Sequence, residues 1–232
     1  MDMDYLEHEY HIAKGTTSYT QHQKFIKQLL FSNESSIIAY HFGLLKRREN
    51  WDLYQSVRYA FLKRGLVAER FLIDRIKHEN DPELQADALQ LLGGLRSKEA
   101  LPLARDFVTH PDSDHRYRGC FVLGWVGTAE DIDLLGKLIF NDSHPLVRGT
   151  AATAQRQIWY RLPETKPKLL AYLQHALKSE EDQEVLSAII ITLQTLLKKN
   201  LGLRENSEER KITGNVDGAK KKALEVLESI DS

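Results

Sequence analysis

Apolar positions recur at helical spacing along most of the chain, and short polar breaks separate the helices that they predict. The clearest part of the pattern alternates long helices, which open at an acidic turn and close near glycines, with shorter partner helices. Read in order, these predicted helices cover 81–95, 99–108, 112–127, 130–140 and a fifth that opens at 142–148.

The long helices are copies of one unit. Aligning their small residues equates Gln85, Arg116 and Arg148, at spacings of 31 and 32 residues, and weaker copies lie around Tyr54 and Val185. One helix pair cannot bury its own apolar face, but stacked pairs bury each other's. The repeat therefore predicts an all-α fold, a right-handed α-solenoid of about six stacked antiparallel helix pairs.

Two short motifs carry a resemblance to a known family. Residues 142–152 have the form D-x-x-P-x-V-R-x-x-A-A, and residues 123–127 have the form L-G-x-V-G. Both resemble HEAT repeats, in particular the short type also seen in phycobilisome lyases, and the resemblance covers roughly residues 50–197. It implies the solenoid fold and says little about function.

The rest of the chain frames these repeats. We expect a single α-solenoid domain over residues 1–232, in which 1–49 forms N-terminal capping helices and 50–197 forms the HEAT-like repeats. Residues 198–218 are polar and nearly free of apolar periodicity, which predicts a flexible loop, with a binding segment as the alternative. A closing helix should follow over 219–232, with three lysines in its first turn that would oppose the helix dipole.

Composition narrows the class of protein. The 32 basic and 33 acidic residues leave a net charge of −1, which disfavours a partner held through many phosphates. The one cysteine, Cys120, fits a reducing compartment. Residues 1–14 lack the apolar core of a signal peptide, and no apolar run approaches the ~20 residues that span a bilayer. We expect a cytoplasmic protein without a membrane partner, monomeric when free.

The histidines and carboxylates offer weak candidates for metal ligands. His110, Asp112, Asp114 and His115 crowd one turn and could hold a divalent ion, but acidic caps at the other junctions favour a capping role. Deoxyhypusine hydroxylases, which this chain also resembles, use His-Glu pairs for iron, and positions 84–85, 115–116 and 147–148 carry none.

No catalytic group stands out either. Cys120 occupies a small-residue packing position, and the chain contains no P-loop, dinucleotide fingerprint or paired zinc spacing. We therefore expect no catalytic residue, no metal and no cofactor.

Aromatic and charged residues supply the candidate binding surface. Trp125 lies in a repeat-closing turn, and a Trp-Tyr-Arg run follows the third repeat; such residues are common interface hot spots, although packing is the alternative. We expect the second helix of each pair to line the inner face, where charges of both signs suit a folded protein. The candidate protein-binding residues are Arg70, Asp74, Arg105, Asp133, Lys137, Trp159, Tyr160, Arg161, Tyr172 and His175.

These observations favour a non-enzymatic scaffold that holds a folded protein partner on its concave face. A bacterial immunity protein that neutralises a toxin domain is a narrower form of this expectation, suggested by family resemblance and size. Two alternatives from another class of function, an enzyme or a chaperone for a ligand, remain open. One is bilin attachment, as in the lyases, and the other is base excision on DNA, as in helical-repeat glycosylases.

Overall fold

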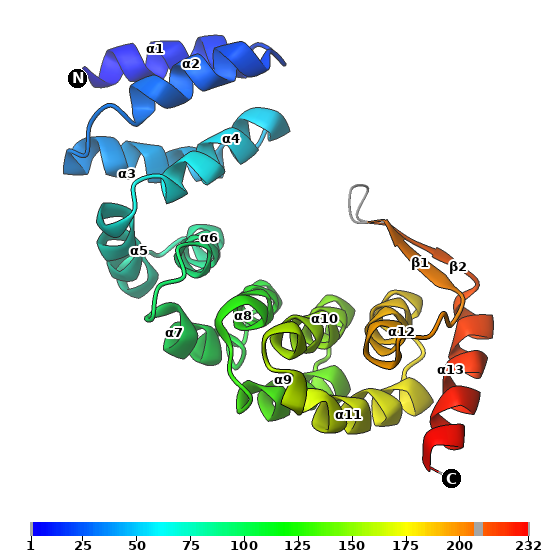
Figure 1. The fold of residues 1–232 in the computed structure, drawn as a ribbon. Helices are drawn as coiled ribbons and strands as arrows, with labels where there is room; N and C mark the ends of the chain where they lie inside the picture. The colour runs from blue at the N-terminus through cyan, green and yellow to red at the C-terminus, as the bar shows by residue number, and fades with distance from the viewer. Residues whose placement is uncertain (1, 207–210, 232) are drawn as a thin grey trace. The chain divides into compact units, whose positions relative to one another are not determined.

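The computed structural model describes residues 2–206 and 211–231, which are mostly α-helical (Figure 1). The chain forms two compact units, Met1–Ala100 (unit 1) and Leu101–Ser232 (unit 2). The helices of unit 1 are α1 (Met3–Lys14), α2 (Tyr19–Leu29), α3 (Ser35–Gly43), the 3₁₀ turn η1 (Leu44–Lys46), α4 (Trp51–Leu62), α5 (Leu66–His78) and α6 (Pro82–Gly94). The expectation that residues 1–232 form a single α-solenoid domain stays a prediction.

Unit 2 continues the alternation of helices and ends with a small hairpin and a final helix. Its elements are α7 (Ala100–Phe107, which begins on the last residue of unit 1), α8 (Ser113–Val126), α9 (Asp131–Asn141), α10 (Pro145–Arg161), the 3₁₀ turn η2 (Pro163–Thr165), α11 (Lys166–Ser179), α12 (Gln183–Leu197), β1 (Leu203–Asn206), β2 (Lys211–Gly214) and α13 (Val216–Asp231). The 13 helices of the described residues confirm the all-α solenoid.

Unit 1 is held together by a buried arginine. The Arg64 guanidinium is 6% exposed and donates to His41 Nδ1 (3.0 Å), to the Leu29 carbonyl (2.7 Å) and to the Ser32 carbonyl (2.8 Å). Because a guanidinium only donates, His41 Nδ1 must accept, so its Nε2–H donates to the Val57 carbonyl at 2.9 Å. Burial lowers the pKa of His41 to about 3, and the nearby Arg64 charge adds to this effect.

Unit 2 is arranged in two layers. Helices α8, α10 and α12 lie side by side in one layer, and α9 and α11 form the other (Figure 1). The central helix α10 packs against α8, α9 and α12, which is why its buried side includes the small residues Ala151, Ala152 and Ala154. This stacking of first and second helices is the arrangement that the repeat predicted.

Gly119 sets how closely α8 approaches α7. A Cβ at this position would lie 2.9 Å from the Ala104 carbonyl oxygen and 2.9 Å from the Val108 nitrogen, both backbone atoms. We expect Gly119→Ala to lower the free energy of unfolding by about 2 kcal/mol, since the helices must move apart. Urea denaturation followed by circular dichroism measures this change.

Gly149→Ala is the matched control for that variant. Gly149 also lies inside a helix, but its added Cβ would meet Ala188 Cβ at an ordinary 3.6 Å. Alanine has the higher helix propensity, by about 1 kcal/mol, so we expect the control to be neutral or stabilising. Equal losses in the two variants would contradict the close approach at Gly119.

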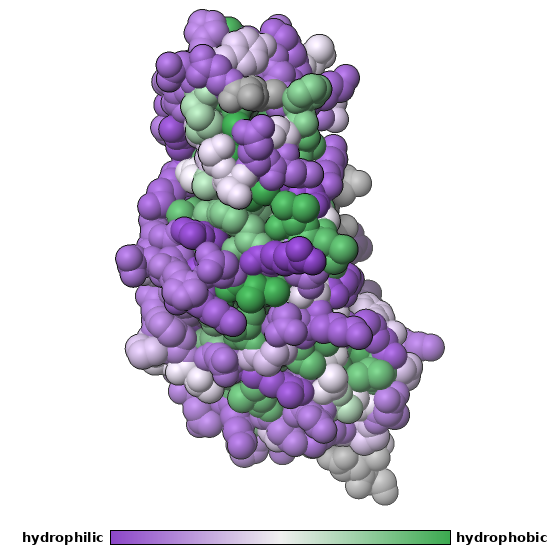
Figure 2. Space-filling view, turned by 90° about the vertical axis from the view of Figure 1, so that its left-hand side faces the viewer, coloured by the Kyte–Doolittle hydropathy of each residue, from purple (hydrophilic) through white to green (hydrophobic). Residues whose placement is uncertain are grey.

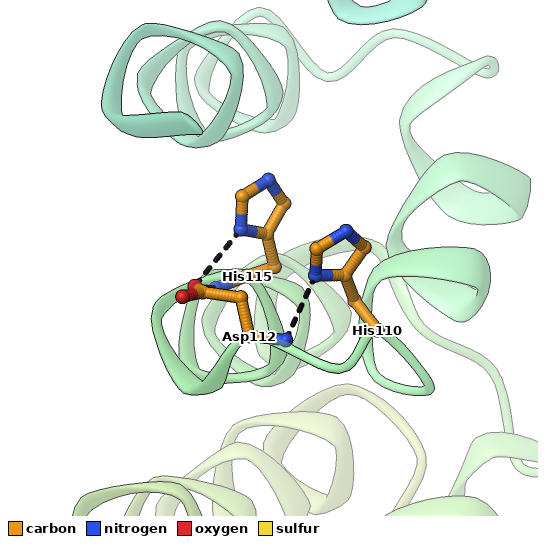
Figure 3. A group of neighbouring side chains, drawn as sticks. All are labelled: His110, Asp112 and His115. Carbon is orange, nitrogen blue, oxygen red and sulfur yellow. Dashed lines mark hydrogen bonds and ion pairs between the residues drawn. The ribbon is translucent and has the colours of Figure 1, made fainter. Parts of the chain in front are cut away.

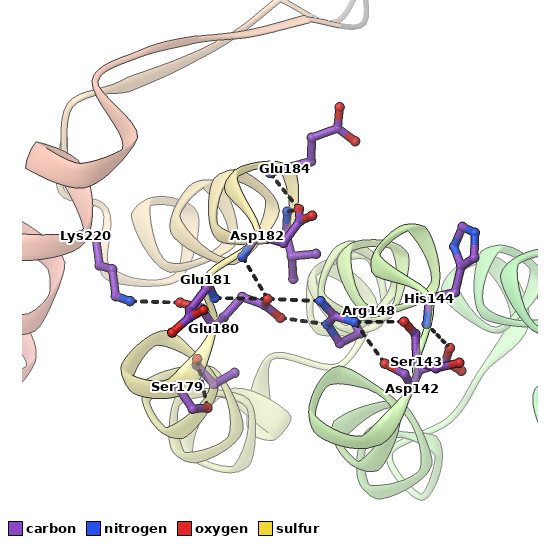
Figure 4. Close-up of polar contacts among 12 residues, drawn as sticks. Asp142, Ser143, His144, Arg148, Ser179, Glu180, Glu181, Asp182, Glu184 and Lys220 are labelled. Carbon is purple, nitrogen blue, oxygen red and sulfur yellow. Dashed lines mark hydrogen bonds and ion pairs between the residues drawn. The ribbon is translucent and has the colours of Figure 1, made fainter.

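An arginine repeats the same contacts at successive junctions of unit 2. Arg116 donates to Asp142 through Nε (2.6 Å) and Nη2 (2.9 Å). Arg148 donates to Glu180 in the same way, at 2.7 and 3.0 Å, as Figure 4 shows. The remaining nitrogen of each arginine bonds the carbonyls of the turn before its own helix. Each guanidinium therefore ties one repeat to the next.

The prediction of a flexible loop over 198–218 is wrong for the strands that lie within it. Strand β1 pairs antiparallel with β2, with Leu203 opposite Gly214. The Gln194 side chain of α12 accepts from the Leu201 and Leu203 N–H groups (2.8 and 3.1 Å), and Arg156 of α10 pairs with Glu205 (2.8 Å). Residues 207–210 of the predicted loop lie outside the described residues.

The last helix also begins earlier than predicted. α13 starts at Val216 rather than 219, because the Asn215 side chain accepts from the Gly218 N–H at 3.0 Å and caps the helix. Lys220, Lys221 and Lys222 therefore do not fall in the first turn. The Lys220 ammonium donates to the Glu180 carbonyl at 2.9 Å, which gives one of the three a structural contact (Figure 4).

Candidate functional site

A shallow groove of about 270 Å³ lies on the layer of α8, α10 and α12. It runs between the aromatic side of α8 and the start of α12, with α10 as its floor. The residues that line this groove, named here the α10 groove, are Tyr117, Phe121, Pro145, Leu146, Gly149, Thr150, Thr153, Glu184, Val185 and Ala188.

The floor of the α10 groove is apolar although it contains two threonines. Thr150 donates its hydroxyl to the Leu146 carbonyl (2.7 Å), and Thr153 donates to the Gly149 carbonyl (3.1 Å). Both hydroxyls are thus satisfied within α10, which leaves their methyl groups as the apolar part of these side chains. Leu146 is 47% exposed at the edge of the groove. The floor suits an apolar group better than a polar one.

One wall of the α10 groove belongs to a row of aromatic residues on α8. Tyr117, Phe121 and Trp125 follow each other at four-residue spacing, with ring centroids 6.1 and 4.7 Å apart. Trp125 lies in the last turn of α8, inside the helix rather than in a separate turn. Sequence reasoning missed Tyr117 and Phe121, although their helical spacing with Trp125 was visible in the sequence.

Several of the residues predicted from sequence gather on the other layer. Asp133 of α9 accepts from the Tyr172 hydroxyl (2.8 Å) and from Lys168 (2.6 Å), and the Phe140 ring meets His175 edge-on at 4.8 Å. An open hollow of about 460 Å³ is lined there by Phe140, Lys168, Ala171, Tyr172 and His175. Lys137 is exposed on α9. The structure thus brings Asp133, Tyr172 and His175 together, away from the α10 groove.

Two predicted arginines make internal contacts. Arg105 of α7 donates to both carboxylate oxygens of the buried Asp131 (2.7 and 3.2 Å), which fastens α7 to the start of α9. Arg161, at the end of α10, donates to the Gly127 carbonyl (2.8 Å) and to the Gly124 carbonyl. Both guanidinium groups therefore stabilise unit 2, and their role in binding a protein stays a prediction.

The remaining predicted residues lie near the end of α10 and on α5. Tyr160 is 62% exposed, and its ring lies 5.1 Å from that of Trp159. Arg70 and Asp74 lie on α5 in unit 1, where Asp74 pairs with Arg75 (3.1 Å). None of these residues lines the α10 groove, which is formed by first helices rather than by the second helices that we expected.

Unit 1 has exposed apolar residues of its own. Leu66 and Val67 at the start of α5 are exposed, as is Phe31 after α2. Figure 2 views the molecule from the side on which α5 lies in Figure 1, and apolar side chains are visible among the polar ones on that face. A small hollow of about 240 Å³ lies between α2 and α4, lined by side chains that include Tyr19, Gln23 and Tyr59. The α10 groove is the larger of these two hollows.

The histidine cluster at the α7–α8 junction has the capping geometry that the sequence favoured (Figure 3). Asp112 accepts from the Asp114 and His115 N–H groups (2.9 and 3.2 Å) and lies 3.0 Å from His115 Nδ1. His110 Nδ1 accepts from the Asp112 N–H, and the two imidazoles stack at 4.0 Å. Burial lowers the pKa of His110. The donor atoms of this group are near enough for a metal, but these bonds already account for their positions.

The fold and the repeated junctions define a helical-repeat protein. A model of HEAT repeats matches residues 69–156 and 116–194, which together span more than half of the chain, so the protein belongs to the HEAT-repeat family. No curated protein sequence matches the chain. In the described part of the chain, no helix combines the length and the apolar character needed to cross a membrane. The narrower resemblance to phycobilisome lyases stays a prediction.

Proposed function

We propose that the protein is a non-enzymatic scaffold that binds a folded protein partner in the cytoplasm, and that the α10 groove is part of the contact. The observation that carries the proposal is an exposed apolar groove with an aromatic wall, on a layer built of family repeats. A few residues buried in pockets carry most of the binding energy of protein interfaces, and tyrosine is common among them. HEAT repeats commonly mediate protein interactions.

Charge also supports a protein partner over a nucleic acid. Two arginines on helices that form the α10 groove, Arg116 and Arg148, each bond a carboxylate of the neighbouring turn. A groove that follows a phosphate backbone needs cations directed at the ligand. Here the cations are already paired, so the apolar contacts are left to provide the affinity.

The test is an affinity capture from the native cell lysate with the full chain, at low and high salt, read by mass spectrometry. We expect one protein in equal amount, retained at high salt and lost when Leu146 is replaced by aspartate. Leu146 is an exposed residue, so this variant should fold normally, which circular dichroism verifies. Recovery of nucleic acid or of a coloured bilin in place of a protein would contradict the proposal.

The immunity interpretation is a narrower form of the same proposal, and it rests on family resemblance and size. Its test begins from the captured partner, which is expressed in a host cell with and without this protein. Rescue of growth by the intact chain, and failure of rescue by the Leu146→Asp variant, would support it. A partner that is harmless when expressed alone would rule out the toxin interpretation and leave the scaffold proposal in place.

A further inference from the structure

The size of the α10 groove limits what can occupy it. Its volume of about 270 Å³ lies below the roughly 300–1,000 Å³ of pockets that enclose small-molecule ligands. The groove is also open to solvent. It therefore suits one or two side chains that project from a larger partner rather than a separate small molecule.

The walls of the groove select an apolar side chain. On one side lie the rings of Tyr117 and Phe121, and on the other lie Val185 and Ala188, with Gly149 between them. The glycine leaves space in the floor, where an added Cβ would only touch Ala188 and Val185. An inserted aliphatic side chain would thus be surrounded by carbon atoms on three sides.

The charge next to the groove is negative. Glu184 lines the groove from the first turn of α12, and no hydrogen bond or ion pair from the described residues reaches its carboxylate. The nearby Arg148 is held by Glu180, with both side chains mostly buried, and Arg116 is held by Asp142 in the same way. Asp114, one helical turn before Tyr117, adds a second exposed carboxylate.

We propose that the α10 groove binds a short segment of the partner protein that inserts one aliphatic side chain over Gly149 and places a lysine or arginine against Glu184. This inference rests on the proposed function, because it names the part of the partner that the scaffold recognises. The aliphatic side chain supplies affinity by burial of apolar surface, and the cation fixes the direction of the segment along α10.

The experiment selects binders from a library of random twelve-residue peptides displayed on phage, with the full chain as bait. We expect selected peptides to share a leucine, isoleucine or methionine with a lysine or arginine close to it. Synthetic peptides of the consensus should bind the Ala188→Glu variant, whose α12 wall carries a charged side chain, at least tenfold more weakly. Ala129→Glu, the same change at an exposed position in the turn before α9, is the control and should bind normally.

The role of Glu184 is tested by exchanging charges. Glu184→Lys should weaken the consensus peptide about tenfold, and a peptide with its lysine changed to glutamate should regain affinity for that variant. The gain should shrink at high salt, as expected for a contact between exposed charges. Peptides without a basic residue, peptides that bind Ala188→Glu as tightly as the original protein, or a selection that yields no binder would each overturn the inference.

Failure of this inference is distinguishable from failure of the proposed function. If the protein captured from lysate binds Ala188→Glu and Leu146→Asp as well as the original chain, the groove is not the contact and the scaffold proposal stands on another surface. If no protein is captured at all, the scaffold proposal itself fails. Thermal unfolding of each variant confirms that a lost interaction does not reflect a lost fold.

Discussion

Replacing Arg148 with alanine should lower the free energy of unfolding by about 3 kcal/mol. The guanidinium forms a two-bond pair with Glu180 and also bonds the Asp142 carbonyl, and both charged side chains are largely buried. Removing one partner leaves the other charge buried without compensation, which costs about 3–5 kcal/mol in comparable sites. We expect a loss at the lower end of this range because the Arg148–Glu180 pair retains some contact with water.

Urea denaturation with a matched surface pair provides the measurement. Lys168 and Asp133 also form an ion pair, but both side chains are about half exposed, so Lys168→Ala should cost less than about 1 kcal/mol. Removing Arg148 and Glu180 together should cost less than the sum of the single changes, since no buried charge is then left alone. Similar losses for Arg148→Ala and Lys168→Ala would show that the pair does not join the repeats.

The second large effect is a loss of stability in mild acid that originates at His41. In the folded chain its pKa is about 3, whereas in the unfolded chain it should be close to 6.5. Between these values the unfolded chain binds a proton that the folded chain excludes, so stability falls as the pH falls. Protonation would also place a hydrogen on Nδ1, which must accept from Arg64. The expected loss from pH 6.5 to pH 4 is about 3 kcal/mol.

The control for this effect is His41→Gln. A glutamine can donate to the Val57 carbonyl and accept from Arg64, but it does not titrate. Burial raises the pKa values of carboxylates such as Glu7 and Glu180, but their arginine partners lower them by more. Protonation of these carboxylates in acid therefore destabilises both proteins equally. The difference between the two denaturation series, measured from pH 7 to pH 4, isolates His41. Parallel curves would contradict the assignment.

The sequence predicted the features of the fold that depend on local interactions. Asp81 and Asp112 cap the helices that they were expected to cap, and Pro145 occupies the first turn of α10. Asp142 lies at the start of the next predicted helix, but its carboxylate accepts from Arg116 Nε and Nη2 (2.6 and 2.9 Å) and from the His144 N–H (2.9 Å) instead of capping α10. The difference arises because a residue 26 positions away competes for the same oxygens.

The features that the sequence did not predict depend on contacts between distant segments. The hairpin of β1 and β2 is anchored by Gln194 and Arg156, which belong to other elements, so the composition of residues 198–218 could not indicate it. The α10 groove is formed where three helices from different repeats meet. Tyr117 and Ala188 have no relation in the sequence, and only packing brings them to one surface.

The paired arginines also bear on how such a chain can change in length. Arg148 lies 32 residues after Arg116, and each guanidinium bonds the turn before it and the carboxylate of the turn after it. If residues 117–148 were lost, Arg116 would precede Gly149 and would meet Glu180 as Arg148 does now. Loss of half that length would remove one helix of a pair. The arginine would then lie in the other layer of helices and would not face the carboxylate of the next junction. The ion pairs thus make the whole repeat the smallest unit that duplication or deletion can add or remove without damage.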